Sequence, residues 1–167
     1  MNLYILRHGI AVPALPVGAK SDFHRPLTPK GRKKVAKIGA AMEGLGLSFS
    51  LILTSPCVRA RQTAEIVAKA FEPHKELEIL KELATGVGPA ALLNKLASQH
   101  LFPEDLLLVG HEPQLSGFIS LLTSGSSHLP IQLKKGGLCK LSLPSLKARQ
   151  HATLEWLLTP RQMLAMR

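Results

Sequence analysis

The chain has 167 residues, a formal net charge of +10, 46% hydrophobic residues and 4% aromatic residues. This composition suits one globular domain over residues 1–167 and excludes a disordered basic tail or a fibrous protein. No apolar run approaches the ~18 residues that a membrane-spanning helix needs, and the apolar run at residues 3–6 starts without a basic leader. We therefore expect a cytoplasmic protein.

The first half of the chain predicts two strands that each lead into a helix. Apolar runs without a turn residue, at residues 2–6 and 50–54, are typical of buried strands. After a loop over residues 12–25, Thr28 and Pro29 are typical of a helix start, with threonine as N-cap and proline at the first helical position. The second helix is expected to reach about residue 71.

The second half of the chain continues the alternation of strands and helices and then ends in two expected strands. Further strands are expected over residues 77–80, 105–109, 138–143 and 153–158, and further helices over residues 89–96 and 113–122. Strands that alternate with helices imply right-handed crossovers and a largely parallel sheet. The fold class expected is a three-layer α/β/α sandwich, with helices on both faces of a mostly parallel central sheet.

Three of the expected strands lead into polar residues of related chemistry. The first is followed by Arg7 and His8, the second by Ser55 with Arg59 soon after, and the fourth by Gly110 and His111. Ligands of open α/β sheets bind beyond the carboxyl ends of the strands, so these segments should meet in one cleft. Guanidinium groups near helix N-termini favour an oxyanion, of which phosphate is the commonest.

A histidine in such a cleft has a possible chemical role. Neighbouring arginines disfavour its cationic form, which keeps one imidazole nitrogen free near neutral pH. That nitrogen can attack phosphorus and form a phosphohistidine. From spacing alone, each histidine could equally be a core or a surface residue, and the joint occurrence of the three motifs favours the catalytic interpretation.

Taken together, the motifs resemble those of the histidine phosphatase superfamily, also called phosphoglycerate-mutase-like. The resemblance rests on Arg7-His8-Gly9, on residues 55–63 and on Val109-Gly110-His111. Within the superfamily the chain is most similar to the small phosphohistidine phosphatases of the SixA type. Those proteins have no cap domain, and they share the Arg-Pro-Leu-Thr segment found here at residues 25–28.

The resemblance implies roles for five residues. His8 would be the nucleophile that is transiently phosphorylated, while Arg7 and Arg59 would hold the phosphoryl oxygens. His111 would donate to the same oxygens, and Arg25 would reach the same pocket. No metal and no cofactor is expected, because fixed donors stabilise the charge of the transition state.

Larger members of the superfamily place a carboxylate after the third strand as a general acid. Here Glu82 is the acid in that region and Asp22 is a second candidate, and the sequence assigns the role to neither. Cleavage of a protonated phosphohistidine releases a neutral imidazole and needs less help from an acid than cleavage of an alkyl phosphate. This difference favours phosphohistidine over sugar phosphates as the substrate.

Three functions stay open at this level. The first is hydrolysis of phosphohistidine in a protein, such as a histidine phosphotransfer domain, since a cleft without a cap admits a protein. The second is hydrolysis of small phosphoesters. The third is a non-catalytic phosphate- or nucleic-acid-binding module, because residues 1–42 hold eight basic residues against one acidic, and residues 128–167 hold seven against one. The few aromatic residues disfavour nucleic acid. No membrane partner is expected, and the sequence does not indicate an oligomeric state.

Overall fold

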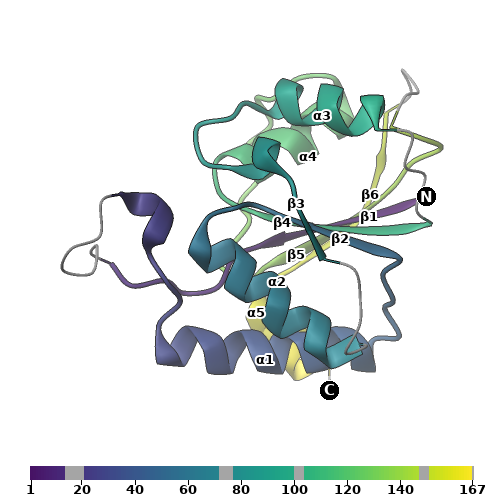
Figure 1. Ribbon diagram of the computed structural model, residues 1–167. Coiled ribbons are helices and arrows are strands. Elements are labelled where there is room, and N and C mark those ends of the chain that lie inside the picture. The colour runs from purple at the N-terminus through teal and green to yellow at the C-terminus, as the bar shows by residue number, and fades with distance from the viewer. Residues whose placement is uncertain (14–20, 72–76, 100–103, 147–150, 167) are drawn as a thin grey trace.

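A six-stranded sheet forms the centre of the protein, with helices on both faces (Figure 1). The computed structural model describes residues 1–13, 21–71, 77–99, 104–146 and 151–166. The strands are β1 (Asn2–Arg7), β2 (Leu51–Thr54), β3 (Leu77–Ile79), β4 (Asp105–Gly110), β5 (Leu138–Ser142) and β6 (Thr153–Leu158). Their order across the sheet is β3-β2-β4-β1-β5-β6, and β5 runs antiparallel to both of its neighbours, β1 and β6, whereas the pairs among β1 to β4 are parallel.

The helices divide between the two faces of the sheet. On one face lie α1 (Pro29–Gly44), α2 (Val58–Phe71) and α5 (Pro160–Ala165), and on the other lie α3 (Pro89–Ser98) and α4 (Gln114–Ser124) (Figure 1). Two short 3-10 helices, η1 (Asp22–His24) and η2 (Lys81–Leu83), belong to the connecting segments. Among the described residues, every helix is too short or too polar to cross a lipid bilayer.

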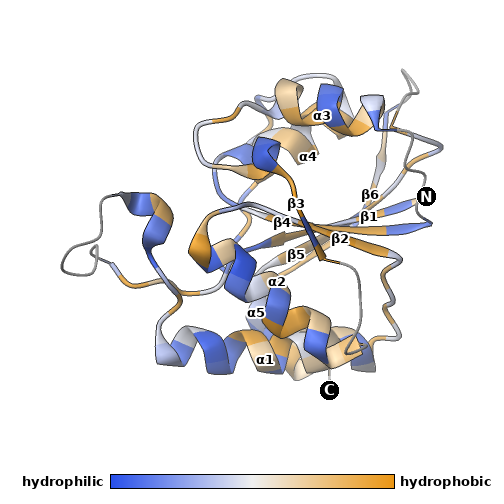
Figure 2. Cartoon of the chain, viewed as in Figure 1, coloured by the Kyte–Doolittle hydropathy of each residue, from blue (hydrophilic) through white to orange (hydrophobic). Residues whose placement is uncertain are grey.

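Side-chain alternation along the strands divides the hydrophobic core into two halves. Leu3 and Ile5 of β1 pack in a cluster with residues of α3 and α4, whereas Tyr4 and Leu6 pack in a second cluster with residues of α1 and α2. The strands between the layers are apolar along most of their length, and α1 and α2 each carry a hydrophobic and a hydrophilic side (Figure 2). The carboxyl ends of the central strands therefore emerge from a well-packed interior.

The structure confirms the three-layer α/β/α sandwich with a mostly parallel sheet. Thr28 is the N-cap of α1, because its Oγ1 accepts a hydrogen bond of 2.9 Å from the Gly31 amide. The six-residue helix α5 is absent from the sequence-based expectation, although Thr159 and Gln162 form a capping box that the sequence spells out. Part of the expected loop over residues 12–25 lies outside the described residues, and the assignment of residues 1–167 to one domain stays a prediction.

The close approach of α1 to the segment after β1 gives a stability test. A methyl group at Gly31 would overlap the carbonyl oxygen of Ile10, whereas one at Gly44 meets nothing within 4 Å. Gly31→Ala should lower the free energy of unfolding by about 1–3 kcal/mol. The matched control Gly44→Ala should leave it equal or raise it by up to about 1 kcal/mol. Urea unfolding measures both, and equal losses in the two variants would contradict this packing.

Candidate active site

Parallel strand pairing brings three strand ends to one edge of the sheet. In the register of β1 with β4, Arg7 lies beside Gly110, and in that of β2 with β4, Thr54 lies beside Val109. Backbone hydrogen bonds continue past the strands, from the His8 amide to the Gly110 carbonyl and from the Ser55 amide to the Val109 carbonyl. In Figure 1 this edge is the end of β1 opposite the labelled N-terminus. The three motifs singled out in the sequence therefore meet, as expected.

The imidazole rings of His8 and His111 lie close together at this edge. Their centroids are 5.0 Å apart, and the side chains are 5% and 2% exposed. His8 Nδ1 lies 2.7 Å from the Gly9 carbonyl oxygen, which can only accept a hydrogen bond. Nδ1 therefore carries the proton of the neutral ring, and Nε2 keeps its lone pair.

Burial keeps both histidines neutral. Loss of hydration lowers the pKa of His8 from 6.5 to about 4, with smaller lowering by Arg59, Arg7 and Lys135, against a hydrogen bond to Gly9 that raises it. Burial is also the largest cause that lowers the pKa of His111, to about 3, and repulsion from a protonated His8 and from Arg59 lowers it further. Desolvation, and not the neighbouring arginines expected from the sequence, is therefore the largest cause of the free imidazole nitrogen.

The arginines of the three motifs are held by oxygens from distant segments. Arg59, in the first turn of α2, is 3% exposed and donates from Nη1 to the Asp22 carbonyl and from Nη2 to Asp22 Oδ2, both at 2.8 Å. The other carboxylate oxygen of Asp22 pairs with Arg25 Nε at 2.8 Å. Arg7 donates from Nη1 to the Leu133 carbonyl at 2.9 Å. Asp22 thus bridges a buried arginine and an arginine at the mouth of the site.

Three buried nitrogens of the site have no hydrogen-bond partner among the described residues: Arg7 Nε, Arg59 Nε and His111 Nδ1. Ser55 Oγ lies 2.8 Å from His111 Nε2, and when the hydroxyl donates to this nitrogen, the proton of neutral His111 lies on Nδ1. Buried polar groups are nearly always paired, so buried nitrogens without a partner at neighbouring strand ends indicate a place for an acceptor. Guanidinium groups of this kind are suited to a tetrahedral oxyanion.

Two further residues fix the segments that carry these groups. Thr63 Oγ1 accepts from the Gly9 amide at 3.1 Å and donates to the Arg59 carbonyl at 2.7 Å. Ser55 Oγ accepts from the Cys57 amide at 3.2 Å. The sequence argument gave Ser55 and Thr63 no role, although both lie in the 55–63 motif, because their contacts depend on where the strand-end loops meet.

The candidate acids lie in different surroundings. Asp22 is paired with two arginines, whereas Glu82 is partly buried in η2 and its carbonyl accepts from Gln114 Nε2 at 2.6 Å. Glu112, which the sequence argument did not consider, follows His111, and burial raises the pKa of its carboxyl group. Within the described part of the chain, no three His, Cys, Asp or Glu side chains gather as a metal site.

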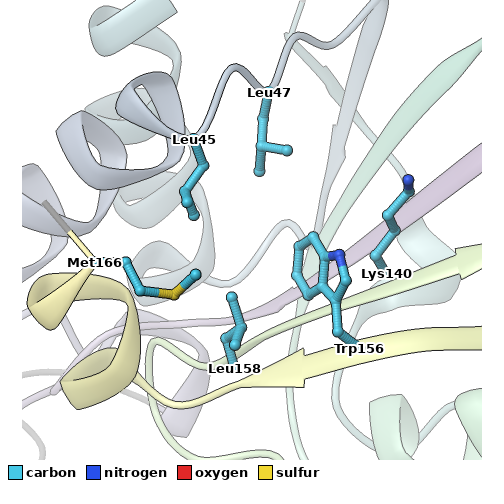
Figure 3. A pocket seen from close by; sticks show the side chains of 6 residues that line it. All are labelled: Leu45, Leu47, Lys140, Trp156, Leu158 and Met166. Atoms are coloured by element: carbon cyan, nitrogen blue, oxygen red, sulfur yellow. The ribbon is translucent and has the colours of Figure 1, made fainter.

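An apolar hollow of about 410 Å³ lies elsewhere on the molecule (Figure 3). It is lined by Leu45, Leu47, Lys140, Trp156, Leu158 and Met166. Among the described residues that line it, Lys140 is the one ionisable residue, and none belongs to the strand-end motifs. The strand ends, with their imidazoles and guanidinium groups, therefore form the candidate active site.

Comparisons with known proteins agree with this geometry. The family model of the histidine phosphatase superfamily (branch 1) matches residues 3–104. An uncharacterised protein of Picosynechococcus sp. is 36% identical over 157 residues, which covers 93% of either chain. The phosphohistidine phosphatase SixA of Escherichia coli is 27% identical over 163 residues, or 96% of this chain and 94% of SixA.

Solved structures share the fold. A SixA structure in complex with tungstate has a TM-score of 0.82 at 24% identity and covers 96% of this chain and 98% of its own. A phosphoserine phosphatase of Entamoeba histolytica has a TM-score of 0.68 at 17% identity and covers 97% of this chain and 98% of its own. Their names give different phosphorylated substrates, so the fold by itself does not determine the substrate.

The low pKa values give a pH test. In the unfolded chain both histidines take up protons near pH 6.5, but in the folded chain His8 does so near pH 4 and His111 near pH 3. Between pH 6.5 and 4 the unfolded state binds more protons, so the free energy of unfolding falls as the pH is lowered. His8→Gln should make this fall shallower by up to about 1.4 kcal/mol per pH unit. Urea unfolding at pH 7, 5.5 and 4.5 measures it, and an unchanged slope would contradict a buried neutral His8.

Proposed function

The chain belongs to the histidine phosphatase superfamily, and we propose that it hydrolyses phosphohistidine in a protein through a covalent intermediate on His8. The observation that carries the proposal is a buried, neutral imidazole at His8 with a free Nε2, close to His111 and near enough to Arg7 and Arg59 for their charges to lower its pKa, while a nitrogen of each of these three residues has no partner among the described residues. The similarity to SixA along nearly the full length supports phosphohistidine as the group that is hydrolysed.

The first chemical step transfers the phosphoryl group to the enzyme. The lone pair of His8 Nε2 attacks phosphorus as the P–N bond of the substrate breaks, and the bonding electrons leave with the substrate's imidazole. That imidazole carries a proton on its other nitrogen, so it departs as a neutral ring. Nδ1 of His8 keeps its proton and its hydrogen bond to the Gly9 carbonyl, which orients Nε2 throughout.

The second step returns the enzyme to its starting state. A water molecule attacks the phosphoryl group on His8, the Nε2–P bond breaks and its electrons return to Nε2, and inorganic phosphate leaves with the oxygen of the water. In both steps negative charge spreads over three phosphoryl oxygens. Arg7, Arg59 and His111 would donate to these oxygens from fixed positions in a site with little water, where such donors stabilise charge most.

Asp22 and Arg25 complete the proposed phosphate pocket at its mouth. The Asp22 side chain is 56% exposed, so its ion pairs with Arg25 and Arg59 are weak enough for an incoming phosphoryl group to share or displace them. Because its carboxylate accepts from two arginines, Asp22 is suited to orienting guanidinium groups rather than to donating a proton. Arg25 would then contact the phosphoryl group through a small shift of its side chain.

A second candidate function is hydrolysis of small phosphoesters, and Glu112 favours it. Glu112 is partly buried, lies near enough to Arg7 to interact with its charge, and has a raised pKa. A carboxyl group that keeps its proton to higher pH can protonate the alkoxide that leaves from an ester. A cytoplasmic location and a histidine phosphotransfer partner stay predictions.

A substrate screen tests the proposed function directly. Wild-type protein should hydrolyse a histidine-phosphorylated protein with a higher kcat/KM than p-nitrophenyl phosphate or sugar phosphates. Rapid acid-free quenching should trap a phosphoenzyme that is stable in alkali and labile in acid, and His8→Ala should lose both the label and the turnover. Full activity of His8→Ala would contradict the nucleophile assignment, and faster turnover of the esters would favour the second candidate.

The proposed phosphate donors predict an asymmetry between two nearby arginines. Arg59 is buried in the site, whereas Arg61 is exposed and pairs with Glu65 at 3.5 Å. Arg59→Ala should lower kcat by about a hundredfold or more, as loss of a transition-state donor does elsewhere. The matched variant Arg61→Ala should change kcat by less than about twofold. Similar losses in the two variants would remove Arg59 from the proposed mechanism.

A further inference from the structure

A groove of about 560 Å³ opens beside the candidate active site and shares Arg7 with it. Among the described residues, five cationic and no acidic side chains line this basic groove: Arg7, Lys34, Lys134, Lys135 and Arg161. They come from the end of β1, from α1, from the turn before β5 and from α5, which packs against α1 (Figure 1). Residues distant in the sequence thus form one positively charged surface next to His8.

Four of the five cations of the basic groove have no ion-pair partner among the described residues, and the fifth, Arg7, lies near the carboxyl group of Glu112. Among the described residues, the ion pairs join Arg25 and Arg59 to Asp22, and Arg61 to Glu65. None involves a lysine of the groove or Arg161, and three of these four cations are exposed. Like charges gathered without counter-charges repel one another, and an anionic partner relieves that repulsion.

The lysine-bearing turn is fixed to the active-site strand. The Gly136 amide donates to the Arg7 carbonyl at 3.0 Å, and the Arg7 amide donates to the Gly137 carbonyl at 3.1 Å. Gly136 has a φ of +75°, which an L side chain rarely adopts. Lys135 is close enough to His8 for its charge to contribute to the low pKa of that imidazole. Lys134 and Lys135 are therefore held beside the site by backbone contacts.

We propose that the basic groove binds acidic side chains that flank the phosphorylated residue of a protein substrate. The proposal rests on the proposed function and names the substrate class more closely: a phosphoprotein with carboxylates next to its phosphorylated residue. Exposed lysines are hydrated point charges that suit carboxylates and the steering of an approaching partner. A small phosphoester, with its one phosphate bound at His8, would leave these cations without a counter-charge.

The lining of the groove favours a protein over a nucleic acid as the binding partner. Proteins that bind single-stranded nucleic acids stack bases on aromatic side chains, and none of the described residues that line the groove is aromatic. The groove would hold a short stretch of polypeptide, since its volume lies within the range of pockets that take ligands of several hundred daltons.

Peptide binding tests the groove without any catalytic step. The probe is a fluorescein-labelled peptide of alternating glutamate and glycine, measured by anisotropy at low salt. The groove variant Lys34→Ala/Arg161→Ala should raise the Kd of the peptide about tenfold. The control variant Lys33→Ala/Lys69→Ala removes two exposed charges outside the groove and should raise this Kd less than about threefold. Lys134→Ala/Lys135→Ala is an independent second variant, and circular dichroism verifies folding. Equal losses in groove and control variants would overturn the proposal, and so would tighter binding of oligo(dT) than of the peptide.

Kinetics then link the groove to the substrate. The ratio of kcat/KM for a histidine-phosphorylated acidic protein to kcat/KM for free phosphohistidine should fall about tenfold in the groove variant and stay near its wild-type value in the control. If the wild type hydrolyses both substrates and the ratio does not change in the groove variant, the groove proposal fails while the proposed function stands. If the wild type hydrolyses neither the phosphorylated protein nor free phosphohistidine, the proposed function fails. The peptide measurement alone then tests whether the groove binds acidic side chains.

Discussion

The parallel pairing of β4 with both β1 and β2 determines where the chemistry of this protein lies. Each of the three strands ends at the same level, so Ser55, His111 and His8 follow one another across a single edge of the sheet. A shift of one residue in either pairing would turn these side chains to the opposite face. The apolar runs that fill the two halves of the core therefore also maintain the register of the candidate active site.

Burial at this edge has two consequences that work together. It removes water from His8 and His111 and so keeps their rings neutral, and it leaves the Nε atoms of Arg7 and Arg59 without a hydrogen-bond partner in the described part of the chain. An unpaired buried guanidinium group would lower the stability of the fold. The carboxylate of Asp22 pairs with Arg59, the most buried of these arginines. In our account a phosphoryl group completes the arrangement, and the basic groove extends the positive surface toward the rest of the substrate.

Much of this organisation could be read from the sequence, because buried strands are continuous apolar runs and the motif residues follow them directly. What the sequence could not supply are contacts set by the path of distant loops. Arg7 and Leu133 are far apart in the chain, as are Arg59 and Asp22, and no local pattern links them. Burial as the main cause of the low pKa of His8 depends on packing from both layers. The helix α5 was within reach of the sequence and was overlooked because it is short.

The nitrogen that carries the phosphoryl group tests the central claim most directly. The hydrogen bond between His8 Nδ1 and the Gly9 carbonyl leaves Nε2 as the one nitrogen of that ring able to attack. NMR of the phosphoenzyme with ¹⁵N-labelled histidine, recorded at alkaline pH through ¹⁵N–³¹P coupling, identifies the bonded atom. The account predicts phosphorus on Nε2 of His8, and phosphorus on Nδ1 or on another residue would contradict it.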